Sequence, residues 1–162
     1  ARMAAGFGME ILYYDIARAP EEIEAQTGAK FTDLDTLLTN SDIVTLHMHL
    51  NESTNGMIGR DQIAKMKKLA FLVNVSRAGL VDNVALLEAL NAEEIWGAGF
   101  DVYDKEPTSL NDPLLTHPHV VATPHMAGST FDAYSTAMSN CVENMRRVRD
   151  GEKPKWVVNG VI

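Results

Sequence analysis

Short apolar runs recur along the chain and alternate with segments of helical period. The runs, each close to the usual length of a strand, cover residues 9–14, 43–46, 71–75, 97–102 and 120–123. They are apolar at successive positions, so both faces of each strand would be buried, and helical segments separate nearly every neighbouring pair. This arrangement is typical of a parallel sheet covered by helices on both sides. The pattern therefore predicts the α/β class.

Capping residues bound the predicted helices. An opening helix would end at Gly8, and a second helix over residues 20–27 begins with proline and is followed by Gly28. Thr32, with Asp35 three residues later, resembles a capping box that opens a short helix. Two further helices are expected over residues 60–67 and over residues 83–90, the latter with Asp82 as its N-cap.

The last predicted helix is the longest, over residues 130–150, and Gly151 would stop it. Its apolar positions recur at intervals of three and four residues, which is typical of an amphipathic helix. They are Phe131, Tyr134, Met138, Cys141, Met145 and Val148. We expect this stripe to be buried, with Cys141 acting as a small apolar filler.

The composition is that of one soluble globular domain. The chain has 162 residues, of which 46% are hydrophobic, enough for a core without disulfide or metal support. Cys141 is the single cysteine, so no internal disulfide can form. No apolar run approaches the roughly 20 residues of a membrane span, and no signal segment precedes the first strand. The expected location is therefore the cytoplasm, with no membrane partner.

The charge balance argues against nucleic acid as a partner. The formal net charge is -8, whereas binding to a phosphate backbone requires clustered Lys and Arg. A cationic run comprises Lys65, Lys67 and Lys68. We interpret it as the solvated last turn of a helix, where positive charge suits the helix dipole.

Candidate chemistry follows from the direction of the strands. In an open parallel sheet, ligands bind outside the carboxyl ends of the strands, so the candidates are the residues that follow each apolar run. Those positions hold Asp15, His47 with His49, Ser76 with Arg77, Asp101 with Glu106 further on, and Pro124 with His125.

Three of these residues carry charges suited to ligand binding. Asp15 could accept both hydroxyl hydrogens of an adenine ribose, or it could be a turn or N-cap aspartate. The planar guanidinium of Arg77 is suited to bind a substrate carboxylate through two hydrogen bonds, although arginines at strand ends also pair with surface acids. The Asp101 carboxylate could accept a hydrogen bond from a carboxamide, or it could cap a loop.

Glu106 and His125 suggest an acid–base pair. A histidine can move a proton near neutral pH, and a carboxylate bound to its other nitrogen fixes the tautomer and stabilises the imidazolium. His125 could instead be a structural histidine. The position of an arginine, two acids and a histidine at one sheet edge favours the catalytic interpretation.

The histidines also permit a metal site. His47 and His49 on extended backbone would place both rings on one face, and His117 and His119 repeat that spacing. Neither pair has a convincing third ligand, so we expect no bound metal.

The segments that hold these residues resemble the D-isomer-specific 2-hydroxyacid dehydrogenases, which include D-3-phosphoglycerate dehydrogenase and related reductases. Residues 7–15 resemble the end of the first Rossmann helix and the second strand, and residues 41–47 resemble the family's third conserved strand. The arginine motif is similar to residues 74–82. The most specific similarity lies in residues 99–107 and 123–128, because residue types and spacing agree together.

The resemblance implies a role for each candidate. His125 would be the general acid in reduction and the base in oxidation, Glu106 its partner, and Arg77 the group that holds the substrate carboxylate and 2-oxo oxygen. Asp101 would orient the nicotinamide and Asp15 the ribose. The cofactor site would further comprise Arg77 and His125 themselves together with His47, Met48, Val75, Ser76 and Gly128. A homodimer is also implied.

The cofactor implied is NAD. The acid Asp15 would repel a 2′-phosphate, although Arg18 lies close enough in sequence to keep NADP open. Hydride chemistry would belong to the nicotinamide, while the protein positions it and supplies the proton.

The chain departs from the family pattern at three places. Ala78 stands where a glycine usually follows the arginine, and His49 stands where a proline is usual. The first strand and its glycine-rich loop would come just before Ala1, so the Rossmann-like, doubly wound sheet is expected to be truncated, without its central strand. The NAD-binding domain would cover residues 1–150, and residues 151–162 would return toward a substrate domain.

The expected function is that of an NAD-dependent D-2-hydroxyacid dehydrogenase, an oxidoreductase that interconverts a D-2-hydroxy acid and a 2-oxo acid. One alternative is an NAD(H)-sensing module without turnover, as in transcriptional corepressors that resemble this family. A more distant alternative is a metal-dependent hydrolase that uses the His-x-His pairs.

Overall fold

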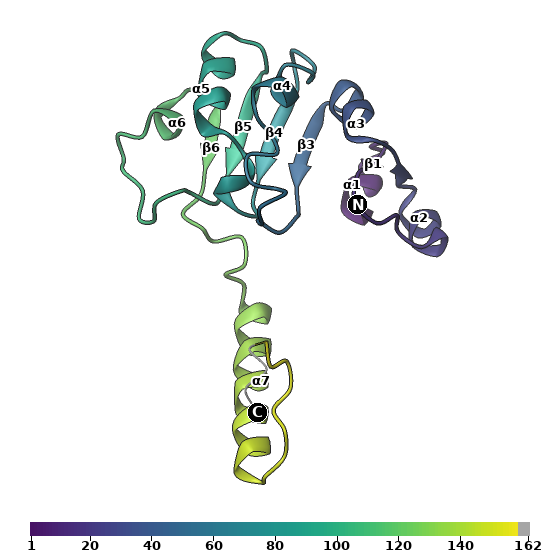
Figure 1. Cartoon of the computed structure of the whole chain (residues 1–162), viewed down its shortest axis with the longest axis vertical. Helices are drawn as coiled ribbons and strands as arrows, with labels where there is room; N and C mark the ends of the chain where they lie inside the picture. The colour runs from purple at the N-terminus through teal and green to yellow at the C-terminus, as the bar shows by residue number, and fades with distance from the viewer. Residues whose placement is uncertain (159–162) are drawn as a thin grey trace. The chain divides into compact units, whose positions relative to one another are not determined.

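The structure, a computed structural model, describes residues 1–158 and confirms the α/β class (Figure 1). By contacts within the chain, it divides into two compact units, residues 1–124 and residues 125–162. The strands are β1 (Leu12–Tyr13), β2 (Lys30–Phe31), β3 (Ile43–Leu46), β4 (Phe71–Asn74), β5 (Gly97–Phe100) and β6 (Val120–Ala122). All of the strand pairs are parallel.

Four strands form the main sheet, in the order β3-β4-β5-β6. The register places Leu72 opposite both Val44 and Ala98, so these three residues form a row across the sheet. Because successive parallel strands point the same way, each connection must cross back over the sheet. The carboxyl ends of the four strands therefore share one edge, as the pattern predicted.

Strands β1 and β2 form a separate two-stranded sheet, in which Tyr13 pairs with Phe31. The sequence pattern predicted β1 as a longer strand and missed β2. A two-residue strand that contains a lysine is too short to show a hydrophobic period. The T-shaped contact of the Tyr13 and Phe31 rings, with centroids 5.3 Å apart, joins the two strands through their side chains.

The helices of the first unit lie between these strands. They are α1 (Arg2–Gly6), α2 (Glu21–Thr27), α3 (Leu34–Asn40), α4 (Arg60–Ile63), the 3-10 turn η1 (Ala78–Leu80), α5 (Asn83–Asn91) and α6 (Pro113–Thr116). Gly28 caps α2 with φ 67°, a left-handed conformation that glycine adopts without strain. Asp82 caps α5, and its carboxylate accepts from the N–H groups of Val84 and Ala85. Both predicted caps are confirmed.

Two predictions about helix ends are wrong. The N-cap of α3 is Asp33, whose Oδ1 accepts from the N–H of Thr36 at 2.8 Å, so Thr32 does not cap it. Helix α4 ends at Ile63. Lys65 and Lys67 therefore lie beyond the helix rather than in its last turn, and they form ion pairs with Asp35 and Asp42.

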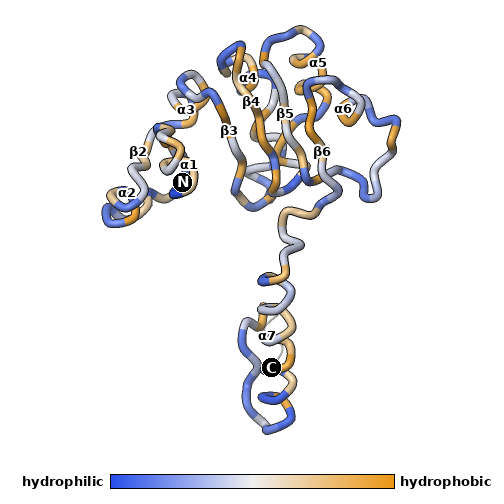
Figure 2. Tube along the Cα trace, turned by 180° about the vertical axis from the view of Figure 1, so that it is seen from behind, coloured by the Kyte–Doolittle hydropathy of each residue, from blue (hydrophilic) through white to orange (hydrophobic). Residues whose placement is uncertain are grey.

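One face of the main sheet is buried under α4 and α5. The core joins strand residues to both helices and includes Val44, Leu72, Ala98, Phe100, Ile63, Leu86, Ala89 and Leu90. The central strand β4 is hydrophobic over most of its length (Figure 2). Burial of these side chains supplies the main stabilisation of the unit.

The opposite face of the sheet is more open than the pattern predicted. Ile43 and Phe71 are 46% and 41% exposed, and Val121 is 71% exposed. Strands that are apolar on both faces were expected to be covered on both. An apolar face identifies a surface that favours burial, but the pattern does not say which segment covers it.

The second unit is built on α7 (Phe131–Arg149), which confirms the predicted long helix. Thr130 caps its start by accepting from the N–H of Ala133, and Gly151 follows its end with φ 75°. The chain then runs back along the helix, where Arg147 and Asn144 donate to the carbonyl groups of Lys153 and Lys155, respectively (Figure 1).

The apolar stripe of α7 is exposed, which corrects the prediction that it is buried. Phe131 and Met145 are 86% and 69% exposed, and Cys141 is an exposed free thiol rather than a filler. The helical period correctly identified an apolar face (Figure 2). It carried no information on what packs against that face. Among residues 1–158, no helix combines the length and apolar character needed to cross a membrane.

Candidate active site

The end of β1 presents Asp15 beside a small polar network. Asp15 is exposed, and its Oδ1 accepts from the N–H of Ala17 at 3.5 Å. Close by in sequence, Arg18 donates twice to the Glu24 carboxylate at 2.8 Å, and the Tyr13 phenol donates to the same group. The hydrogen bonds from Arg18, and then from Tyr13, lower the pKa of Glu24 to about 2. The guanidinium of Arg18 is therefore engaged by Glu24.

The ends of β3 and β4 are tied together by a side chain. The Ser76 hydroxyl donates to the Leu46 carbonyl at 2.7 Å, which links the turn after β4 to the last residue of β3. His47 follows directly, and its Nε2 lies 3.0 Å from the Thr45 hydroxyl. Met48 is half-buried against the core.

Asn74 shapes the turn that presents Arg77. This residue is 1% exposed; its Oδ1 accepts from the N–H of Ser76 at 3.1 Å, and its Nδ2 donates to the Arg77 carbonyl at 2.8 Å. The Arg77 guanidinium is exposed and donates to the Ser76 carbonyl. The sequence analysis did not single out Asn74. The available signal was a polar residue at the end of an apolar strand, a position that requires buried hydrogen bonds.

Asp101 is a buried carboxylate at the end of β5, with 2% exposure. Its Oδ1 accepts from the Thr123 hydroxyl at 2.5 Å, and its N–H donates to the Asn74 carbonyl at 3.2 Å. These contacts join β5 to both of its neighbours. Burial of an acid at this edge costs free energy unless hydrogen bonds compensate it, and the Thr123 hydroxyl supplies one.

Glu106 lies on the loop after β5 and is held from the same loop. The N–H of Tyr103 donates to Glu106 Oε1 at 3.2 Å. The Tyr103 phenol donates to the Thr123 carbonyl at 2.7 Å, at the end of β6. Burial, and then the charges of Asp101 and Glu106, raise the pKa of Tyr103, so the phenol keeps its proton at neutral pH.

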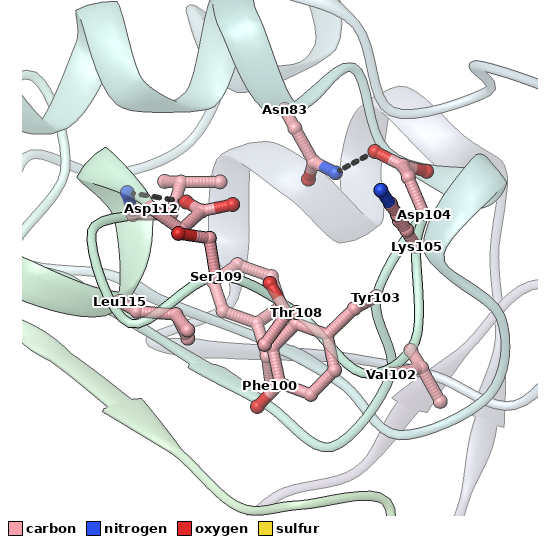
Figure 3. A pocket seen from close by; sticks show the side chains of 11 residues that line it. Asn83, Phe100, Val102, Tyr103, Asp104, Lys105, Thr108, Ser109, Asp112 and Leu115 are labelled. Carbon is pink, nitrogen blue, oxygen red and sulfur yellow. Dashed lines mark hydrogen bonds between the residues drawn. The ribbon is translucent and has the colours of Figure 1, made fainter.

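A cavity of about 200 Å³ lies beside this loop (Figure 3). Its walls are Asn83, Phe100, Val102, Tyr103, Asp104, Lys105, Thr108, Ser109, Asp112, Leu114 and Leu115. The Asn83 amide donates to Asp104 at 2.7 Å across its rim (Figure 3). None of the residues predicted for the site lines it, and Tyr103 is the link between the cavity and Glu106.

His125 and Gly128 lie in the second unit, in the segment before α7. His125 is exposed and has φ 53°, a left-handed conformation that is uncommon outside glycine. A side chain at Gly128 would meet no atom within 4 Å. The pairing of Glu106 with His125 stays a prediction.

The match to known proteins identifies the domain. Residues 1–127 match the family described as D-isomer specific 2-hydroxyacid dehydrogenase, NAD binding domain. That stretch is well over half of the chain. The chain belongs to the D-isomer specific 2-hydroxyacid dehydrogenase family.

Relatives of this dehydrogenase domain agree with the match. The glyoxylate reductase of Korarchaeum cryptofilum (strain OPF8) is 44% identical over 159 residues, which are 98% of this chain and 48% of the relative. The glyoxylate/hydroxypyruvate reductase B of Serratia proteamaculans (strain 568) is 42% identical over 154 residues, 95% of this chain and 47% of the relative. The chain thus spans about half the length of these curated relatives.

A solved structure with the same fold has the cofactor bound. The D-lactate dehydrogenase of Lactobacillus jensenii, crystallised with NAD+, matches with a TM-score of 0.88 and 33% identity. The match covers 98% of this chain and 51% of that one. The Rossmann-like class predicted from the resemblance is confirmed.

Within this dehydrogenase domain, the fold brings several predicted residues to one edge. His47, Ser76, Arg77 and Asp101 follow the ends of β3, β4 and β5, and hydrogen bonds through Ser76, Asn74 and Thr123 connect those ends. Val75 is half-exposed beside Ser76. Asp15 lies at the end of β1, which belongs to the two-stranded sheet.

The pair His117 and His119 makes hydrogen bonds within the described residues. His119 Nδ1 lies 2.8 Å from the Trp96 carbonyl, and the His119 N–H donates to His117 Nδ1. In residues 1–158, no group of three or more His, Cys, Asp or Glu side chains is arranged to hold a metal ion.

Proposed function

We propose that this domain serves an NAD-dependent dehydrogenase that transfers a hydride between NAD(H) and a D-2-hydroxy acid/2-oxo acid pair. The observation that carries the proposal is the exposed guanidinium of Arg77, presented at the carboxyl edge of the sheet by the buried Asn74. A planar cation in that place suits a substrate carboxylate. The relatives named glyoxylate and hydroxypyruvate reductases support a small 2-oxo acid as the substrate class.

The described residues fit a dinucleotide. The exposed carboxylate of Asp15 is suited to accept from the ribose hydroxyls, and the backbone after β3 and β4 at Met48 and Val75 is suited to line the cofactor. Because Glu24 engages Arg18 through two hydrogen bonds, Arg18 is poorly placed to receive a 2′-phosphate. We therefore propose NAD rather than NADP. Bound NAD would supply or accept the hydride.

The chain's own residues would bind the acid and move the proton. Arg77 would hold the substrate carboxylate and its 2-oxo oxygen through its N–H groups. His125 would donate a proton from its imidazole to that oxygen during reduction and take it back during oxidation. Glu106 would accept from the other ring nitrogen, fix the tautomer and stabilise the imidazolium. Asp101 would accept from the nicotinamide carboxamide.

The proposal extends to the whole protein. The family resemblance supports a homodimer, and the acidic net charge of -8 supports a small-molecule partner rather than nucleic acid. We place the protein in the cytoplasm.

The test follows NADH absorbance with a panel of small 2-oxo acids, using the full-length protein. We expect turnover in the wild type and a loss of at least about 100-fold in kcat for His125→Asn, the scale of general acid–base catalysis. His117→Asn makes the same chemical change outside the proposed site and should retain turnover. Turnover that survives in His125→Asn would contradict the acid–base role.

Other outcomes would favour the alternatives. NADH binding without turnover on any acid would indicate an NAD(H)-sensing module. Activity that a chelator abolishes and that is indifferent to NADH would indicate a metal-dependent hydrolase.

A further inference from the structure

Tyr103 connects the loop of Glu106 to the end of β6. Its backbone N–H donates to Glu106 Oε1 at 3.2 Å, while its phenol donates to the Thr123 carbonyl at 2.7 Å. One residue therefore contacts the carboxylate through its main chain and the neighbouring strand end through its side chain. Thr123 is two residues before His125 in the chain.

Thr123 is itself firmly held. Its N–H donates to the Phe100 carbonyl at 2.9 Å, and its hydroxyl donates to the buried Asp101 at 2.5 Å. The phenol of Tyr103 therefore binds to a residue just after β6 that is itself hydrogen-bonded to the end of β5. A hydrogen bond to such a residue restricts the loop that carries Glu106.

The phenol remains a hydrogen-bond donor at neutral pH. Burial raises the pKa of Tyr103, and the carboxylates of Asp101, Glu106 and Asp112 raise it further. All three of these negative charges disfavour a phenolate. A carbonyl acceptor requires the protonated phenol, so the contact with Thr123 persists at neutral pH.

We propose that Tyr103 is a positioning residue for the acid–base pair: its phenol, bonded to the Thr123 carbonyl, holds the backbone N–H that orients the Glu106 carboxylate. This inference rests on the proposed roles of Glu106 and His125. The phenol does not contact the reacting atoms. It acts through Glu106, whose carboxylate sets the proton affinity of the imidazole.

The expected consequence has a definite sign. In reduction His125 gives up a proton to the substrate, so activity falls on the alkaline side of the pH profile. A well-held carboxylate stabilises the imidazolium and extends activity to higher pH. When the carboxylate is held less well, the alkaline limb of the pH profile moves to lower pH.

The test compares Tyr103→Phe with the wild type in the full-length protein. Phenylalanine keeps the ring in the cavity wall and the backbone N–H, and it removes the phenol. We expect kcat for reduction to fall about 3- to 10-fold, a fraction of a full acid–base contribution, with little change in the KM for NADH. The alkaline limb should move down by about half a pH unit.

Two further variants and two further measurements make the result decisive. Glu106→Gln should also move the alkaline limb of the pH profile to lower pH, and by more than Tyr103→Phe does. The matched control is Tyr134→Phe, which removes a phenol on α7 that lies 3.5 Å from the Ser129 hydroxyl, and it should leave the alkaline limb in place. Thermal unfolding and NADH fluorescence show whether each variant is folded, and a loss of stability alone does not move the limb.

The outcomes separate this inference from the proposed function. If Glu106→Gln shifts the limb while Tyr103→Phe does not, the positioning role is wrong and the acid–base pair stands. If neither variant shifts it, or if His125→Asn keeps full turnover, the acid–base pair fails and the positioning role fails with it. A shift in Tyr103→Phe with unchanged NADH binding supports the role.

Discussion

Asn74 shows how a single buried polar side chain can arrange a candidate site. Its side chain forms hydrogen bonds with both the N–H of Ser76 and the carbonyl of Arg77, so the turn after β4 is held in one conformation. The Asp101 N–H, in turn, donates to the Asn74 carbonyl. The chemistry proposed for Arg77 therefore depends on a residue that would not contact the substrate.

At the residue scale we expect Asn74→Leu to impair both folding and substrate binding. Leucine has a similar size but leaves two backbone groups without their partner, and each such buried group costs about 1–3 kcal/mol. The free energy of unfolding should fall accordingly, and the KM for the 2-oxo acid should rise because Arg77 loses its fixed turn. Urea unfolding and steady-state kinetics measure the two effects. Asn91→Leu, at an exposed position in α5, is the control, and equal effects in both variants would contradict the prediction.

At the element scale, strand β5 contains two glycines with different surroundings. A Cβ at Gly97 would lie 2.7 Å from the His119 carbonyl oxygen, whereas a Cβ at Gly99 would meet its nearest atoms at 3.9 Å. The first contact is with backbone and is too short to keep, so β6 or β5 must move. The second is ordinary van der Waals contact. Only the first position requires glycine for the spacing of neighbouring strands.

We therefore expect Gly97→Ala to destabilise the protein by about 1–3 kcal/mol, the usual cost of overpacking. Gly99→Ala makes the same change two residues further along the strand and should cost much less. Urea unfolding of the two variants gives the comparison directly. Similar destabilisation by both substitutions would mean that strand propensity rather than the His119 contact governs this strand.

At the scale of the whole molecule, residues 1–162 contain the candidate chemistry but no G-x-G-x-x-G sequence. The backbone N–H groups of such a loop, at a helix N-terminus, form the usual cradle for a dinucleotide pyrophosphate. In the proposed site, residues at the ends of β3, β4 and β5 would contact other parts of the cofactor, but the phosphate charge would lack this cradle.

Residues 1–162 produced by themselves should therefore bind NADH weakly or undetectably. Isothermal titration calorimetry on this polypeptide measures the affinity, with the full-length protein as the positive control. Micromolar binding by residues 1–162 alone would contradict the prediction and would mean that the strand-end residues suffice.

The hydrophobic pattern predicted much of this molecule because its signals are local. Four apolar runs became the strands of the main sheet, and Gly28, Asp82 and Gly151 bound helices as expected. A parallel arrangement follows from alternation alone, and it was enough to place Arg77 and Asp101 at one edge. The sequence pattern did not predict strand β2, because two residues are too few to show a hydrophobic period.

Tertiary structure decided what depends on groups distant in sequence. The hydroxyl of Ser76 reaches the end of β3, Thr123 reaches Asp101, and the phenol of Tyr103 reaches Thr123, over separations that no local pattern encodes. Burial differed from expectation for the same reason: the period of α7 shows an apolar face, while exposure depends on what packs against it. The sequence by itself thus determined most of the elements, the sheet edge and the family, because these follow from side-chain periodicity and motif order. The hydrogen bonds that link the strand ends around Arg77 and Glu106 were decided by the tertiary structure, because they join residues that only folding brings together.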